Sequence, residues 1–220
     1  MFIGHYALAP IAAAKGRVKL WQAFIAVQFV DFIWAGFILT GVEKARIVPG
    51  FTQASPFDLY HMPFTHSLLA AVLWALVGAL IFKAMTRAAD WGASLWIAAL
   101  VFSHWLGDLL VHIPDLLVFP GADKVGFGLW KTVGISFPLE LVITLGAMIY
   151  FIRITAPSSP RNKLWIGLFF SVLVVLQVFS NFGPPPASIQ EAAITALIAF
   201  SALAVLAGRF ERTRRLRTVD

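Results

Sequence analysis

The chain has 220 residues, of which 60% are hydrophobic, 13% are charged and none is cysteine, and its formal net charge is +6. A soluble domain is about half apolar and about a quarter charged. This composition therefore excludes a soluble globular enzyme, a disordered segment and a disulfide-stabilised secreted domain. The lack of cysteine also excludes thiolate metal sites, CxxC redox chemistry and a cysteine nucleophile.

The apolar segments, taken in chain order, predict an all-α, polytopic transmembrane helical bundle. Residues Met1–Ala14 are apolar but too short to cross a bilayer at ~1.5 Å per residue, so we expect a short re-entrant or half-depth helix there. A spanning helix needs ~20 mostly apolar residues. Six later segments reach that length and are predicted to be spans: Val18–Gly41, His66–Met85, Trp91–Val118, Thr132–Ile154, Lys163–Phe182 and Ser188–Gly208.

The local sequence predicts the boundary between the fifth and sixth spans. Gly183 and the three prolines that follow it interrupt the chain, because proline cannot continue a helix. Ser188 and Glu191 then form an S-x-x-E capping box, which is typical of a helix start. We therefore expect the sixth span to begin at Ser188.

The distribution of basic residues predicts the orientation. With alternating spans, 13 of the 17 Lys and Arg residues fall on one side of the membrane and 4 on the other, and the positive-inside rule places the 13 in the cytoplasm. We expect one membrane-embedded domain, residues 1–208, and a basic cytoplasmic tail, residues 209–220, near anionic lipid. Because the positive charge lies in short loops beside spans, no nucleic-acid partner is expected. The four residues on the outer side are Lys44, Arg46, Lys124 and Lys131.

Ionisable residues inside the spans indicate a functional layer, because such groups are costly at membrane depth. At ~1.5 Å per residue, those of five separate segments lie about 15 to 27 Å from the cytoplasmic ends of their helices. We therefore predict one polar layer between the midplane and the outer surface. Its members are His5, Asp31, His66, His104, Asp108 and Glu140.

The third full span carries the most specific local pattern. His104, Asp108, His112 and Asp115 are spaced i, i+4, i+8 and i+11, which predicts that they lie along one helical face. His and Asp one turn apart can chelate one metal ion or form a hydrogen-bonded relay. The alternative is a buried polar stripe that holds helices together through hydrogen bonds of ~0.6 kcal/mol each.

The segment "HMPFTHSLLA" places two more histidines near a span. His61 and His66 flank Pro63, which favours an extended turn, and Thr65 is expected to cap the helix that follows. The alternative is a pair of interfacial histidines without a ligand. Glu140 taken alone suits a helix-packing acid, a proton relay or a catalytic acid equally well.

Four of these segments together resemble a known family. Gly4-His5, Asp31, "HMPFTHSLLA" and "SHWLGDLL" are similar, in this order, to the motifs of the predicted membrane-bound metal-dependent hydrolases of bacterial inner membranes. Members typically show Gly-His, P-D-x-D-H, H-R-x-F-T-H-S and S-H-x-x-x-D. The resemblance covers about the first half of the chain, and its third and fourth motifs match at His61, Phe64, Thr65, His66, Ser67, Ser103, His104 and Asp108.

The resemblance implies a metal site and a distant relation to zinc-dependent phospholipase C-like enzymes. The metal ligands that it implies are His5, Asp31, His61, His66, His104 and Asp108. The chain departs from the family pattern in the second and third motifs. Ile33 and Trp34 stand where the second motif has ligands, and Met62 stands where the third motif has an arginine.

The expected function is a membrane-embedded hydrolase with a divalent metal ion that opens to the periplasmic side of the bacterial inner membrane. Asp and His ligands suit zinc, with manganese, iron or nickel as alternatives. Glu140 is the predicted general base, and the location points to an ester or phosphoester of a lipid or another small molecule in contact with membrane lipid. The alternatives are a cation or proton transporter, which the lack of a repeat disfavours, and a non-catalytic assembly or regulatory subunit.

Overall fold

The computed structural model describes residues 1–87, 91–119 and 121–217. Six helices carry most of the chain: α3 (Phe29–Thr40), α4 (Leu68–Thr86), α5 (Gly92–Val111), α6 (Val133–Ile154), α7 (Asn162–Phe182) and α8 (Ile189–Glu211). Shorter ones are η1 (Ile3–Ala7), α1 (Leu8–Ala14), α2 (Leu20–Val27) and η2 (Leu129–Lys131). Three two-stranded antiparallel sheets pair β1 (Lys44–Ile47) with β2 (Phe57–His61), β3 (Leu116–Leu117) with β4 (Lys124–Val125) and β5 (Thr155–Pro157) with β6 (Arg214–Leu216).

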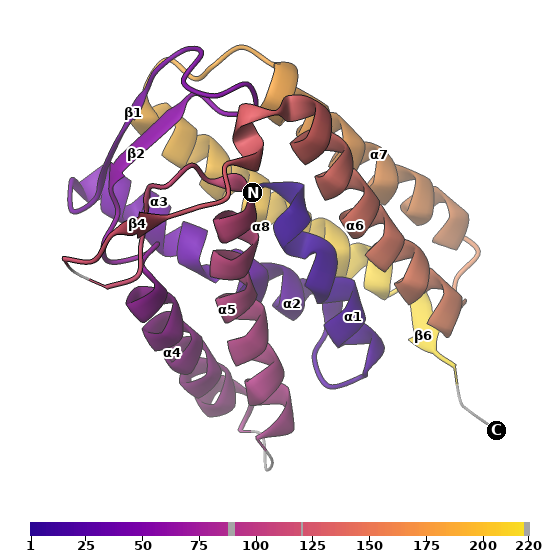
Figure 1. Cartoon of the computed structure of the whole chain (residues 1–220). Helices are drawn as coiled ribbons and strands as arrows, with labels where there is room; N and C mark the ends of the chain where they lie inside the picture. The colour runs from indigo at the N-terminus through magenta and orange to yellow at the C-terminus, as the bar shows by residue number, and fades with distance from the viewer. Residues whose placement is uncertain (88–90, 120, 218–220) are drawn as a thin grey trace.

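The predicted helical membrane bundle is confirmed. The helices α4, α5, α6, α7 and α8 are each long and apolar enough to span a bilayer, and α2 and α3 together make a sixth candidate. Figure 1 shows α4 beside α5 on one flank and α6 beside α7 on the other, with α1 between them. The outward face of α4 exposes Leu69, Leu73, Leu76 and Leu80, as expected for a helix that contacts lipid.

The first span is broken, which the sequence did not predict. The axes of α2 and α3 differ by 47° at Gln28, so Val18–Gly41 is not one continuous helix. Gln28 is buried, and its side-chain Nε2 donates a hydrogen bond to the carbonyl oxygen of Phe2 at 3.5 Å. A buried amide needs such partners, and here the N-terminal segment supplies one from another part of the chain.

The expected half-depth helix is present as η1 followed directly by α1 (Ile3–Ala14). Ile3, Tyr6, Ala9 and Ala12 are fully buried, and the helix packs against α2, α5 and α6 inside the bundle. The hydroxyl of Thr144 in α6 donates a 2.7 Å hydrogen bond to the carbonyl oxygen of Ile3. The N-terminal turn is therefore anchored deep in the bundle.

Two predicted helix boundaries near the site are wrong. The third full span was expected to run to Val118, but α5 ends at Val111 and His112 is extended, because the residues before Pro114 are biased away from helix. The predicted cap Thr65 does not cap α4, which begins at Leu68. Ser67 caps that helix instead, and its side chain accepts a hydrogen bond from the backbone N–H of Ala70.

The basic C-terminal residues pack against the bundle and do not form a simple tail. The helix α8 extends to Glu211, and residues 214–216 pair with β5, so the described part of residues 209–220 packs against the bundle; residues 218–220 lie outside the description. The buried guanidinium of Arg214 donates hydrogen bonds to Thr155 and Asn162. Arg17, Lys19, Arg214 and Arg215 line one hollow at this basic end of the bundle. The opposite end, which carries the hairpins β1–β2 and β3–β4 and residues 183–188, is called the site end below.

Candidate metal centre

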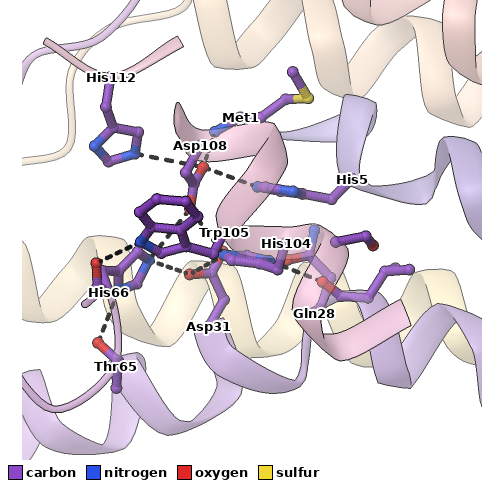
Figure 2. A network of polar contacts seen from close by, with 12 residues as sticks. Met1, His5, Gln28, Asp31, Thr65, His66, His104, Trp105, Asp108 and His112 are labelled. Carbon is purple, nitrogen blue, oxygen red and sulfur yellow. Dashed lines mark hydrogen bonds and ion pairs between the residues drawn. The ribbon is translucent and has the colours of Figure 1, made fainter. Parts of the chain in front are cut away.

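Five ionisable side chains from four separate segments converge inside the bundle (Figure 2). His5 comes from η1, Asp31 from α3, His66 from the turn before α4, and His104 and Asp108 from α5. Ligand atoms of His5, Asp31 and His104 lie within 4.8 Å of one another, as do those of His66, His104 and Asp108. These are five of the six ligands that the resemblance implies.

Asp108 lies at the centre of the group. Its Oδ1 is 3.1 Å from Nε2 of His5 and 3.4 Å from Nε2 of His112. Its Oδ2 is 3.1 Å from Nε2 of His104 and 3.6 Å from Nε2 of His66. Asp31 Oδ1 closes the other side, at 3.3 Å from Nε2 of both His66 and His104. The amino nitrogen of Met1 also lies 2.6 Å from Asp108 Oδ1.

The glycine between the two ligands of α5 makes room for His5. The imidazoles of His5 and His104 stack with their centroids 3.8 Å apart and their planes 11° apart. A Cβ built on Gly107 would lie 3.0 Å from Nδ1 of His5, which is tighter than an ordinary contact. The i, i+4 spacing of His104 and Asp108 therefore forms the site only together with a glycine at Gly107.

Glu140 holds the N-terminal turn against the site. Its Oε2 accepts hydrogen bonds from the backbone N–H groups of Phe2, at 2.8 Å, and Gly4, at 3.0 Å. These bonds fix the turn that presents His5 to Asp108. The contacts give Glu140 a positioning role, and its predicted role as general base stays a prediction.

The hydrogen bonds at the back of His66 determine which nitrogen carries its proton. Thr65 Oγ1 donates to the carboxylate of the buried Glu43 and lies 2.7 Å from Nδ1 of His66. A hydroxyl has one proton to donate, and the carboxylate takes it. Thr65 must therefore accept from the N–H at Nδ1, which leaves the lone pair of neutral His66 on Nε2, facing Asp31 and Asp108.

His104 and His112 are oriented in the same way. Nδ1 of His104 lies 2.8 Å from the carbonyl oxygen of Val27, at the bend between α2 and α3. Nδ1 of His112 lies 2.9 Å from Asp115 Oδ1. A carbonyl or carboxylate only accepts, so both rings donate from Nδ1 and direct Nε2 to Asp108. Outer hydrogen bonds of this kind orient histidine ligands in metal sites.

The donor set fits a divalent cation. Lone pairs on Nε2 of neutral imidazoles and negative carboxylate oxygens lie 3.1–3.6 Å apart, an arrangement that a divalent ion among them would stabilise, as ring protons would. Within the described part of the chain, His104 Nε2, Asp108 Oδ2 and both ring nitrogens of His5 are buried without a hydrogen-bond partner. Buried polar atoms without partners are rare and point to a missing ligand. Nitrogen and oxygen donors together suit zinc, manganese, iron or nickel.

A cavity of about 610 Å³ at the site end leads to this group. Asp31, His66, Asp108, His112 and Glu140 all line it. The cavity also touches the loop at residues 49–57 and the turn at residues 183–186. A water molecule or a substrate therefore has a route from the surface to the histidine and aspartate side chains.

The structure does not bring His61 to the site. His61 is exposed at the end of β2, where it pairs in register with Lys44, while its neighbour Met62 is buried. Pro63 separates the two histidines of the motif, so the chain turns between them and only His66 enters the bundle. The spacing of the motif could not decide this, because it fixes proximity along the chain and not direction.

Sequence reasoning left out one residue that contacts a ligand, His112, and one that acts on a ligand through Thr65, Glu43. His112 belonged to the predicted polar face of its span but not to the predicted ligand set. It is the C-terminal cap of α5, and its ring packs at a tilt against Trp130, with ring centroids 4.3 Å apart. Glu43 is 1% exposed and contacts Thr65 across 22 positions of sequence. Because Glu43 lies beside Lys44 and Arg46, its local sequence is that of a solvated acid in a loop, and nothing in that sequence indicates that its side chain is buried.

Exchanging Glu43 for glutamine is expected to weaken metal binding about 10–100-fold, the usual effect of losing an outer hydrogen-bond partner. The glutamine amide can donate to Thr65 Oγ1, which then donates to Nδ1 of His66 and moves the ring proton to Nε2. Competition with a chelator on purified protein measures the affinity. Asp58→Asn removes a surface carboxylate that contacts Arg46, and it should leave the affinity unchanged. Equal metal affinity in Glu43→Gln and Asp58→Asn would contradict the role of the hydrogen bonds that link Glu43 to His66 through Thr65.

The comparisons with known proteins give a family but no described relative. No curated protein and no solved structure matches the chain. A family model, the YdjM inner membrane protein family, matches residues 6–183. This range contains Asp31, His66, His104, Asp108 and His112, and His5 lies one residue before it. Because the match covers most of the chain, this multi-pass membrane protein belongs to the YdjM inner membrane protein family.

Proposed function

We propose that the protein is a metal-dependent hydrolase of an ester or phosphoester. One observation carries the proposal: four imidazoles present Nε2 to two carboxylates in a buried group that a cavity reaches. A group that only joined helices would hydrogen-bond its polar atoms to one another, whereas here several have no hydrogen-bond partner within the described residues. The resemblance of the sequence motifs to membrane-bound metal-dependent hydrolases supports the same function.

His5, Asp31, His66, His104 and Asp108 would hold the ion, with His112 beside them. When bound, a divalent ion lowers the pKa of water to ~7 and polarises the bond to be hydrolysed. The outer partners Glu43, Val27 and Asp115 keep the protons of three rings on Nδ1, away from the ion. Asp31 and Asp108 supply the negative charge that balances it.

Glu140 is the proposed proton acceptor for the attacking water. It lines the same cavity as Asp31 and Asp108. Both of its backbone hydrogen bonds use Oε2, so Oε1 is the oxygen that can accept a proton. A carboxylate in this place serves twice, because it positions His5 through the N-terminal turn and faces the water.

The site is proposed to open to the periplasm, with the C-terminus in the cytoplasm, because 13 of the 17 Lys and Arg residues lie at the other end of the spans. A topology reporter inserted at Ser159, between α6 and α7, is expected to score cytoplasmic. The same reporter inserted at Gln53, in the loop that lines the cavity, should score periplasmic. A cytoplasmic signal at Gln53 would reverse the orientation and place the site on the inner face.

Metal analysis of purified protein tests the function directly. Wild-type protein is expected to retain about one transition-metal ion per chain, and His104→Ala should lose most of it, because metal sites tolerate few missing ligands. His61→Ala is the matched control, since it removes a histidine of the same motif that is exposed and outside the site. Wild-type protein that is folded, free of metal and unchanged by added zinc would contradict the hydrolase and favour an assembly subunit.

A further inference from the structure

The cavity that reaches the candidate metal centre has two chemically different parts. One wall carries the polar residues of the site, including Asp108, whose Oδ2 is buried without a partner among the described residues. The side formed by α7 and α8 is mostly apolar, with Leu176 and Phe179 of α7 and Ala192, Ala196 and Ala199 of α8. Ser180, Asn181, Glu191 and Thr195 of the same helices add polar groups to it. A ligand that fills the cavity must therefore combine a polar group with an apolar body.

The apolar wall lies within the membrane-spanning helices. Ala192, Ala196 and Ala199 occupy the first three turns of α8 at i, i+4 and i+7, so they share one face. Their small side chains leave the space between α8 and α7 open. Phe179 lines the cavity, and 59% of its surface is exposed. The apolar part of the cavity, here called the acyl arm, is therefore open at α7, one of the candidate membrane spans.

The charged residues that line the cavity determine which polar group of a ligand it can bind. Asp31, Asp108, Glu140 and Glu191 line it, and no Lys or Arg is present among the described lining residues. A phosphodiester carries a permanent negative charge and is recognised by Arg or Lys. One divalent ion and the amino group of Met1, which lies 2.6 Å from Asp108 Oδ1, supply three positive charges against these four carboxylates. No surplus of positive charge remains for such a substrate. A neutral carboxylic ester meets no such repulsion.

We propose that the substrate is a carboxylic ester of a membrane lipid, with its acyl chain in the acyl arm and its ester group at Asp31 and Asp108. This proposal rests on the proposed hydrolase function and names its substrate class. The rest of the lipid stays in the bilayer, which the open side of the arm at Phe179 permits. A substrate confined to water would leave the apolar wall without a partner.

The reaction is the addition of water across the acyl bond. The water oxygen forms a bond to the acyl carbon, and the bond from that carbon to the alcohol oxygen breaks. The proton that Glu140 accepts passes to the leaving alcohol oxygen. The products are one alcohol and one fatty acid, and the acid releases one proton at neutral pH. The proposal therefore predicts free fatty acid from the lipid, with the phosphate group left on the alcohol product.

The test uses full-length protein with zinc in vesicles of dioleoylphosphatidylcholine, with release of oleate as the readout. The wild type should release oleate, and Ala196→Trp, which fills the acyl arm, should reduce the rate at least ten-fold with unchanged metal content. Hydrolysis of the short ester p-nitrophenyl acetate should persist, because it does not need the arm. Ile198→Trp is the matched control: it lies two residues along α8, with 65% of its surface exposed, and should behave like wild type. Ala199→Leu replaces Ala196→Trp if the larger variant does not fold.

A binding measurement separates this proposal from the hydrolase function. A phosphatidylcholine with a diazirine in its acyl chain should label peptides of α7 and α8 in the wild type, even without metal, and the labelling should fall in Ala196→Trp. Release of phosphocholine in place of oleate would overturn the choice of ester and keep the hydrolase. Equal oleate release by Ala196→Trp and wild type would show that the acyl chain does not bind in the acyl arm. Protein that labels at α7 and α8 but binds no metal would overturn the hydrolase while the lipid site stands.

Discussion

Replacing Asp108 with asparagine is expected to lower metal affinity at least about 100-fold, because it removes the carboxylate that lies within 3.6 Å of four imidazoles. Asparagine keeps the size of the side chain but brings no charge. Its Oδ1 can still accept from the amino group of Met1, and its amide N–H₂ can donate to the lone pair on Nε2 of His104. The metal-free variant therefore keeps its hydrogen bonds and loses only the ion pair with Met1, so it should still fold. The expected loss is therefore specific to the metal.

Thermal unfolding in detergent with and without zinc measures this difference. A ligand at about 100 times its Kd stabilises a folded protein by about 2.7 kcal/mol, so zinc should raise the Tm of the wild type and leave that of Asp108→Asn unchanged. Asp123→Asn changes an exposed acid in the loop between β3 and β4 and should respond to zinc like the wild type. If no protein responds to zinc and Asp108→Asn keeps wild-type metal content, the polar layer only joins helices, at ~0.6 kcal/mol per hydrogen bond.

Gly107→Val should reduce metal affinity roughly 10–100-fold without removing any ligand, because it displaces a ligand that must be placed within about 0.2 Å. A Cβ at this position already lies 3.0 Å from Nδ1 and 3.2 Å from Cε1 of His5, and the two γ-methyl groups of valine need more space. His5 must then move away from Asp108. Helix α5 itself should not suffer, since valine has a higher helix propensity than glycine.

Gly146→Val in α6 is the matched control, because nothing lies within 4 Å of a Cβ built there. It makes the same chemical change in a helix of similar length and should leave metal affinity unchanged. A chelator competition assay on the two variants gives the comparison. Equal affinities would show that His5 does not contribute to the site. Equal losses in both variants would instead indicate a general effect of valine on the bundle.

The properties that the sequence determined are local ones. The long apolar segments specify the spans, and the length of Met1–Ala14 specifies a helix too short to cross. Ser188 caps α8, with its hydroxyl accepting from the N–H of Glu191, while the side chain of Glu191 accepts from the N–H of Ala187. The pairing of His104 with Asp108 follows from their i, i+4 spacing on one helix. In each case the interacting residues are neighbours along the chain, so hydropathy and helical period are sufficient.

The bend at Gln28 and the end of α5 are two features that hydropathy along the chain did not predict. The hydropathy of Val18–Gly41 fits one helix, but the buried amide of Gln28 interacts with Phe2, which no local pattern announces. Pro114 did carry a signal for the end of α5, and the continuous apolar run around it concealed that signal. Tertiary contacts overrode hydropathy in the first case, and backbone sterics did so in the second.

Which ionisable residues meet was decided by the tertiary structure alone. His61 and His66 belong to one motif, yet only His66 enters the bundle, while Glu43 reaches it from 22 residues before Thr65. His5 meets Asp108 because Glu140 holds the N-terminal turn and Gly107 leaves space for the ring. The sequence supplied the depth of each group through the rise per residue of its own helix. The direction in which each side chain points depends on how separate helices pack, and that is set by contacts between residues far apart in the chain.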